Sequence, residues 1–161
     1  MKLHDIFMLQ KNLFTKNSKS DLSQRIKKIK KIRKWIKENE KLIIETILRD
    51  YKKPITEIYT TEFKPVISHI DYTLRNIKKW NSSKIVQTPL HLLGTKSKIY
   101  YEPKGICLII SPWNYPLNLT INPLISSIAA GNYNIIKPSE FTPNLSELIK
   151  KMISELFNDQ E

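Results

Sequence analysis

Apolar residues recur at helical spacing through the first part of the chain. Asp21 can cap a helix there, with Gln24 as its capping-box partner. Spacings of three, four and seven predict one long amphipathic helix from there to about Tyr51. Its apolar stripe consists of Leu22, Ile26, Ile29, Ile32, Ile36, Ile43 and Ile47. A shorter helix is expected before it, over Leu3–Phe14.

A second helical stripe follows Pro54, a residue that suits the first position of a helix. The stripe consists of Ile55, Ile58, Val66, Ile70, Ile77 and Trp80. Pro65 lies inside this pattern and predicts a kink or a restart of the helix. The chain up to Trp80 is therefore expected to be mostly helical.

The pattern changes after a polar break at Asn81–Ser83. Lys84–Gln87 and Ser97–Tyr101 are predicted to form two strands of a hairpin-like excursion. Ile106–Ile110 is a continuous apolar run, which is typical of a strand buried on both faces of a parallel sheet.

The remainder alternates between helix and strand. Leu117–Ala130 is apolar enough for a buried helix, and Gly131 suits its left-handed end. Asn134–Lys137 is the next expected strand, and a last helix starts at Thr142 and ends at about Phe157.

The predicted fold is α/β: N-terminal helices followed by the first βαβα part of a doubly wound, Rossmann-like parallel sheet, incomplete and with a hairpin-like excursion. Residues 1–83 are expected to be a helical part of this unit, residues 84–102 the hairpin, and residues 103–161 a partial dinucleotide-binding unit.

Composition restricts the chemistry. Cys107 is the single cysteine, so no intramolecular disulfide forms, and its place in an apolar strand predicts an inert thiol. The three histidines are scattered without metal-ligand spacing, so no metal site is expected. With only three glycines, the chain has no glycine-rich cradle for phosphates.

The net charge of +12 has two possible interpretations. One is a polyanionic partner such as nucleic acid. The other is the solvated face of an amphipathic helix, because the lysines of Lys27–Lys37 alternate with apolar residues. Only Trp35 could stack on a base in this run, so the second reading is favoured and no nucleic-acid partner is expected.

No apolar run approaches the roughly 20 residues of a membrane span. The first residues do not resemble a signal peptide. We therefore expect no transmembrane segment and a cytoplasmic protein.

Polar residues follow the two strands at the edge where α/β sheets bind ligands. Asn114 lies between two prolines, and its neutral amide could stabilise a developing oxyanion. It could equally satisfy backbone groups of its own turn. Lys137 and Glu140 could bind the hydroxyls of a ribose, or they could be ordinary surface charges.

Several blocks of sequence resemble the NAD(P)-dependent aldehyde dehydrogenases. They are Tyr101-Glu102-Pro103-Lys104-Gly105, Ser111-Pro112-Trp113-Asn114-Tyr115-Pro116, Ala129-Ala130-Gly131-Asn132 and Ile136-Lys137-Pro138-Ser139-Glu140. Asn118-Leu119-Thr120, Asp50-Tyr51-Lys52-Lys53-Pro54 and Thr61-Glu62 are similar to the class 3, fatty-aldehyde branch. The likeness covers almost the whole chain. The chain resembles only the N-terminal portion of the family's proteins.

The resemblance implies roles for individual residues. Asn114 would be the oxyanion-hole asparagine, and Lys137 and Glu140 would hold the adenine ribose of NAD or NADP. Ile110, Ser111, Pro112 and Trp113 would line the cofactor cleft. The Lys84–Tyr101 excursion would belong to an oligomerisation hairpin.

Departures from the family matter equally. The nucleophilic cysteine, the general-base glutamate and a later glycine-rich turn have no counterpart here, and Tyr133 and Asn134 replace small or apolar residues. The expected function is the N-terminal portion of an aldehyde dehydrogenase that oxidises medium- or long-chain aliphatic or aromatic aldehydes to carboxylic acids, inactive alone. It would form a homo-oligomer or associate with the missing C-terminal part. The alternatives are a non-catalytic module that binds a full-length relative and, less favoured, a basic nucleic-acid binder.

Overall fold

The computed structural model describes residues 3–16 and 21–157. The elements are α1 (Leu3–Lys16), α2 (Leu22–Glu38), α3 (Glu40–Asp50), α4 (Ile55–Ile58), the π-helical turn η1 (Tyr59–Phe63), α5 (Lys64–Trp80), β1 (Lys84–Val86), the 3₁₀ turn η2 (Leu90–Leu92), β2 (Ser97–Ile99), β3 (Ile106–Ile110), α6 (Asn118–Ala130), β4 (Tyr133–Lys137) and α7 (Pro143–Leu156).

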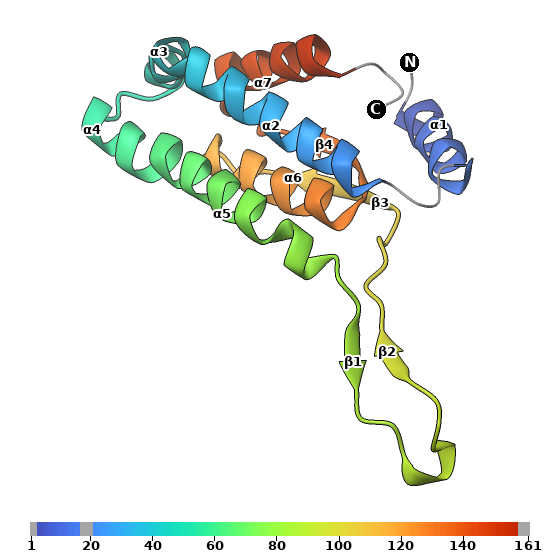
Figure 1. Ribbon diagram of the computed structural model, residues 1–161. Helices are drawn as coiled ribbons and strands as arrows, with labels where there is room; N and C mark the ends of the chain where they lie inside the picture. The colour runs from blue at the N-terminus through green and yellow to red at the C-terminus, as the bar shows by residue number, and fades with distance from the viewer. Residues whose placement is uncertain (1–2, 17–20, 158–161) are drawn as a thin grey trace.

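The body of the molecule is a helical layer on a small parallel sheet. β3 pairs with β4 in parallel, with Ile106 opposite Tyr133 and Ile110 opposite Lys137, and α6 connects the two strands. Helix α6 packs on the sheet, α2 and α5 pack on α6, and α3 packs on α7 (Figure 1). The antiparallel hairpin of β1 and β2 projects away from this body.

Isoleucines dominate the core between the helices. Ile29, Ile36, Ile70, Ile121 and Ile125 are among the side chains without solvent exposure. They come from α2, α5 and α6, which are the elements with the predicted apolar stripes. Burial of these side chains fixes the helical layer that lies behind the sheet.

The long helix predicted up to Tyr51 is wrong in one respect, because the structure has two helices there. The break lies at Asn39, whose φ of −109° is not helical. Its side-chain amide donates to the Trp35 carbonyl at 2.9 Å, which completes the end of α2. The break turns α3 toward α7, against which it packs.

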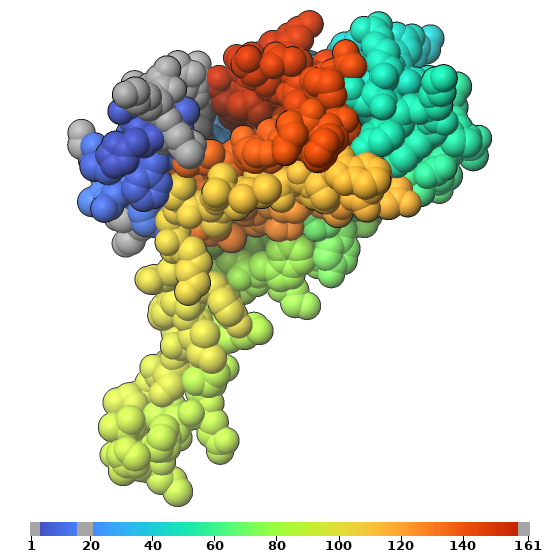
Figure 2. Space-filling view, turned by 180° about the vertical axis from the view of Figure 1, so that it is seen from behind, coloured from blue at the N-terminus to red at the C-terminus, as the bar shows by residue number. Residues whose placement is uncertain are grey.

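The expectation that β3 is buried on both faces is also wrong. Ile109 faces the helices and is buried, whereas Leu108 is 57% and Ile110 is 67% exposed. Cys107, expected in the core, is half-buried. The helical layer covers one face of the sheet, and residues near 110 lie open on the other, in gold in Figure 2. A continuously apolar strand is typical of a complete parallel sheet that is covered on both faces. β3 and β4 alone do not form such a sheet.

The other predicted elements are confirmed within small differences at their ends. Pro65 lies in the first turn of α5, directly after the π-helical turn, so the helix restarts where the proline predicted. Gly131 ends α6 with a φ of +90°. The α/β fold class with a small, incomplete parallel sheet is confirmed. None of the helices within residues 3–16 and 21–157 combines the length and the hydrophobicity of a membrane span.

Candidate functional site at the carboxyl edge of the sheet

The parallel pairing of β3 and β4 brings the predicted site residues to one edge of the sheet. Ser111–Tyr115 follow β3, and Pro138–Glu140 follow β4. The backbone N–H of Ser111 donates to the carbonyl of Lys137 at 3.1 Å, which extends the ladder by one bond. The turn that contains Asn114 and the segment that contains Glu140 therefore leave the sheet side by side.

The predicted site residues differ in their exposure. Ile110, Pro112, Trp113 and Asn114 are exposed to solvent at this edge. Ser111 is buried, and its hydroxyl has no hydrogen-bond partner within the described ranges. The edge thus presents exposed apolar and aromatic side chains beside a neutral amide.

Side chains from the segment between α3 and α4 support the backbone of this turn. The hydroxyl of Tyr51 donates to the carbonyl of Trp113, and the two rings stack with centroids 6.1 Å apart. The Lys53 ammonium donates to the carbonyl of Asn114 at 2.5 Å. Two successive carbonyls of the turn are therefore held by side chains that are distant in sequence.

Glu62 lies beneath the same turn and has no solvent exposure. Its Oε2 accepts the backbone N–H of Leu117 at 2.9 Å. Its Oε1 lies 3.7 Å from the Lys53 Nζ, too far for a hydrogen bond, so the two form an ion pair. Burial raises the pKa of Glu62, and the Leu117 N–H and Lys53 partly oppose this.

The sequence patterns did not indicate Tyr51, Lys53 or Glu62 as site residues. A signal for Glu62 was present, because it lies four residues after Ile58 and four before Val66, on the apolar stripe. A carboxylate on a buried helical face needs partners inside the protein. Tyr51 and Lys53 carry no such signal, since both lie in an irregular segment.

Lys137 and Glu140 pair with each other at the end of β4. The Lys137 Nζ donates to Glu140 Oε2 at 2.5 Å, and both side chains are exposed. This hydrogen bond lowers the pKa of Glu140, so its carboxylate is an anionic acceptor at neutral pH. Such a carboxylate can accept hydrogen bonds from sugar hydroxyls.

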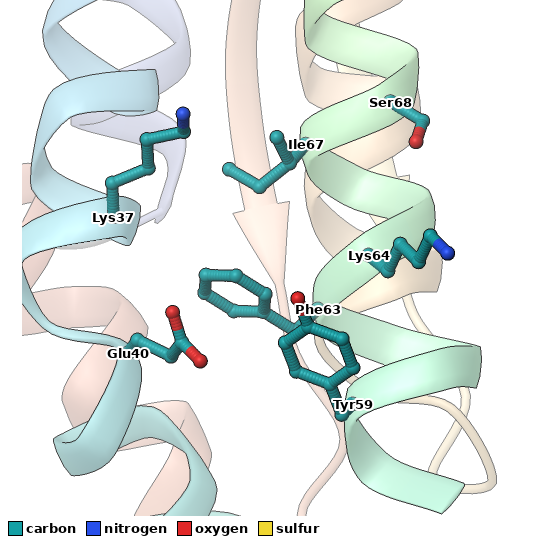
Figure 3. A pocket seen from close by; sticks show the side chains of 7 residues that line it. All are labelled: Lys37, Glu40, Tyr59, Phe63, Lys64, Ile67 and Ser68. Atoms are coloured by element: carbon teal, nitrogen blue, oxygen red, sulfur yellow. The ribbon is translucent and has the colours of Figure 1, made fainter. Parts of the chain in front are cut away.

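An open groove of about 460 Å³ lies elsewhere, where α2 and α3 face η1 and α5. It is lined by Lys37, Glu40, Tyr59, Phe63, Lys64, Ile67 and Ser68. In Figure 3 the Lys64 side chain points away from the groove, so the polar groups do not converge on one point. None of the residues that follow β3 or β4 lines this groove, and it is separate from the candidate site.

The site offers donors and a carboxylate but no evident nucleophile. Cys107, the single cysteine, lies in the middle of β3 and not at the carboxyl edge. In the part of the chain that the structure describes, no three His, Cys, Asp or Glu side chains cluster to hold a metal ion. The arrangement fits the binding of a ligand and the stabilisation of a negative charge.

Comparison with known proteins gives a consistent result. The family described as "Aldehyde dehydrogenase family" matches residues 6–159. The 4,4'-diaponeurosporen-aldehyde dehydrogenase of Staphylococcus aureus is 43% identical over 94% of this chain and 33% of its own length. The aldehyde dehydrogenase family 3 protein comG of Dictyostelium discoideum is 33% identical over 95% of this chain and 33% of its own length.

Solved structures agree. The substrate-bound AldH of Staphylococcus aureus superposes with a TM-score of 0.95 and 41% identity, over 99% of this chain and 35% of that one. A variant of the betaine aldehyde dehydrogenase of Staphylococcus aureus, solved with NAD+, has a TM-score of 0.83 and 25% identity, over 96% and 31%. The chain thus spans about a third of the length of the relatives that it matches.

Proposed function

Because the chain belongs to the aldehyde dehydrogenase family, we propose that it supplies the N-terminal part of an enzyme that oxidises aldehydes to carboxylic acids with NAD+ or NADP+. The observation that carries this proposal is the shared carboxyl edge of β3 and β4. Asn114 follows β3 and the Lys137–Glu140 pair ends β4, and the Ser111–Lys137 backbone bond brings these two strand ends together at that edge. A reacting carbonyl and a dinucleotide would meet there.

Asn114 is the proposed oxyanion donor. When a thiolate adds to the aldehyde carbon, the carbonyl oxygen becomes negatively charged. A preorganised amide N–H₂ stabilises this charge more than it stabilises the neutral carbonyl, which lowers the barrier. Its place within a turn bounded by two prolines suits this task.

Lys137 and Glu140 are the proposed contacts to the adenosine ribose. Lys137 engages one oxygen of the Glu140 carboxylate, and the carboxylate can also accept hydrogen bonds from ribose hydroxyls. Ile110, Ser111, Pro112 and Trp113 form the proposed wall beside the cofactor. The cofactor, when bound, accepts the hydride from the substrate carbon.

The chain by itself is proposed to be inactive. The route requires a thiolate at the reacting carbon, and Cys107 is held within a strand. The proposed substrates are medium- or long-chain aliphatic or aromatic aldehydes. Two relatives are named for diaponeurosporen-aldehyde and for coniferyl aldehyde.

A direct test joins this chain, in place of the matching third, to the rest of the Staphylococcus aureus relative. Aldehyde-dependent reduction of NAD+ or NADP+ is expected from the joined protein and not from the 161-residue chain. Asn114→Ala should lower kcat by about 10²–10³-fold. The control Asn76→Ala, on α5, should retain activity. Turnover by the isolated chain, or an Asn114→Ala variant with unchanged kcat, would contradict the proposal.

A second candidate is a non-catalytic module that binds a full-length relative. The hairpin supports it, because Ile85, Leu90, Leu93 and Tyr100 are strongly exposed apolar side chains. This module should co-elute with such a relative, and Leu90→Glu with Leu93→Glu should abolish co-elution. A stable monomer that does not bind the relative would exclude this candidate.

A further inference from the structure

The turn that carries Asn114 rests on a buried ion pair from a distant part of the chain. Lys53 holds the carbonyl of Asn114, and Glu62 holds the N–H of Leu117. The two side chains face each other at 3.7 Å. The backbone between these two fixed points is only Tyr115 and Pro116, so little freedom remains in it.

We propose that Lys53 and Glu62 are positioning residues that hold Asn114 in the orientation required for charge stabilisation. This inference rests on the proposed function of Asn114. An asparagine side chain has two rotatable bonds beyond Cα, so the direction of its amide depends on where the backbone places Cβ. Lys53 fixes the carbonyl of Asn114 itself, which determines the orientation of the peptide that follows Cα.

Each member of the pair depends on the other. Glu62 is fully buried, and its Oε1 makes no hydrogen bond within the described residues, so the Lys53 ammonium provides the compensating charge. Lys53 also lies over the ring of Tyr115 at 4.3 Å and near that of Tyr51 at 5.3 Å. These rings favour a cation at this point. Loss of either charge leaves the other poorly compensated in a low-dielectric place.

The local backbone directs Glu62 toward the turn. Glu62 belongs to η1, where the helix has the wider π-helical geometry before it restarts at Lys64. Single π-helical turns are frequent at functional sites. Here the turn places one carboxylate on an otherwise apolar face, at the start of α6, where the Leu117 N–H is available.

A purely structural role would also explain a buried ion pair. The two roles differ in what a variant changes. A structural pair affects the free energy of unfolding, whereas a positioning pair affects kcat at full occupancy and leaves the KM for the cofactor unchanged. The conservative change Lys53→Arg retains the charge and should restore part of the effect.

The kinetic test uses the joined enzyme. Lys53→Met keeps the aliphatic stem but removes the charge, and it should lower kcat by about 10–100-fold with an unchanged KM for the cofactor. Lys53→Arg should recover part of this loss. The matched control Lys52→Met, at the exposed neighbouring position, should behave as the parent. A kcat of Lys53→Met within twofold of the parent would overturn the proposal.

A second test does not depend on catalysis. In the 161-residue chain, hydrogen exchange at the Leu117 amide should accelerate by about tenfold or more in Glu62→Gln and Lys53→Met, while the Ile121 amide in α6 stays protected. Unchanged exchange in both variants would overturn the proposal, even if Asn114 proves catalytic. The Lys53 side chain is 17% exposed, so Lys53→Met is expected to fold. This variant therefore provides the exchange test if Glu62→Gln does not fold. If the joined enzyme is inactive, the proposed function fails, while the exchange test still decides whether Lys53 and Glu62 fix the turn.

Discussion

At the scale of single residues, close contacts across the sequence decide what each position tolerates. Gly131 has a φ of +90°, and a Cβ there would lie 2.6 Å from the Arg25 Cζ. Arg25 is itself buried and donates to the Asn81 side chain and the Ala129 carbonyl. Gly94 has a similar φ of +94°, but a Cβ there would meet no atom within 4 Å.

These two glycines allow a matched comparison. Gly131→Ala should lower the free energy of unfolding by about 2–4 kcal/mol, because backbone strain and a clash with Arg25 add together. Gly94→Ala should lower it by only about 1–2 kcal/mol, from the strain alone. Urea unfolding measures both. Equal losses would show that Arg25 moves aside without cost.

Glu62 predicts a pH dependence of stability. Its pKa is raised by burial above the ordinary 4.5, so the folded protein binds this proton more tightly than the unfolded chain. The contribution of Glu62 to stability is therefore full below pH 4.5 and is lost as pH rises through the folded pKa. The unfolding free energy of the parent, minus that of Glu62→Gln, should decrease as pH rises over this range. A difference that increases with pH would contradict this assignment.

At the scale of elements, helices are completed by groups from their neighbours. The side chain of Thr142, the N-cap residue of α7, makes no capping hydrogen bond. Instead the Asp50 carboxylate at the end of α3 accepts the backbone N–H groups of Asn144 and Leu145 at 3.1 and 2.8 Å. This contact joins two helices that are almost a hundred residues apart in the sequence.

Removal of this cap should be measurable. Asp50→Ala should lower the free energy of unfolding by about 1–2 kcal/mol, and Asp50→Asn should cost less because its amide oxygen still accepts one bond. Chemical unfolding compares these variants with Glu147→Ala, an exposed position on α7 that should change little. A loss for Glu147→Ala equal to that for Asp50→Ala would point to a general effect of charge.

At the scale of the whole molecule, α6 packs on one face of the sheet, and within the described residues the end of β3 is open on the other. Leu108 and Ile110 are exposed apolar side chains, and the segment around residue 110 lies uncovered, in gold in Figure 2. A strand with a continuous apolar sequence is normally buried on both sides in a parallel sheet. This face therefore suits packing against the rest of an aldehyde dehydrogenase.

This interpretation gives a separate prediction. Leu108→Lys should change the stability of the isolated chain by less than about 1 kcal/mol, because this side chain already faces solvent. The same change should prevent formation of an active, soluble joined enzyme. Tyr72→Lys, an exposed position on α5, is the control and should be tolerated. A fully active joined enzyme that carries Leu108→Lys would show that this face stays open.

Much of the fold could be predicted from local signals. Periodicity identified the helices, Pro65 the restart of α5, and Gly131 the left-handed end of α6, because each depends on neighbours within one or two turns. The break at Asn39 escaped prediction because the apolar stripe continues across it. The position of Asn114 at the carboxyl edge of the sheet could be predicted from strand order, and its role is a proposal.

The sequence by itself determined the order of elements, the isoleucine-rich faces and membership of the aldehyde dehydrogenase family. Only the tertiary structure decided which distant groups meet: Lys53 and Glu62 under the Asn114 turn, Asp50 at the start of α7, and Arg25 against Gly131. It also decided that one face of β3 is open. The physical reason is that apolar periodicity reports which side of an element is buried, whereas partners and coverage depend on how all the elements pack.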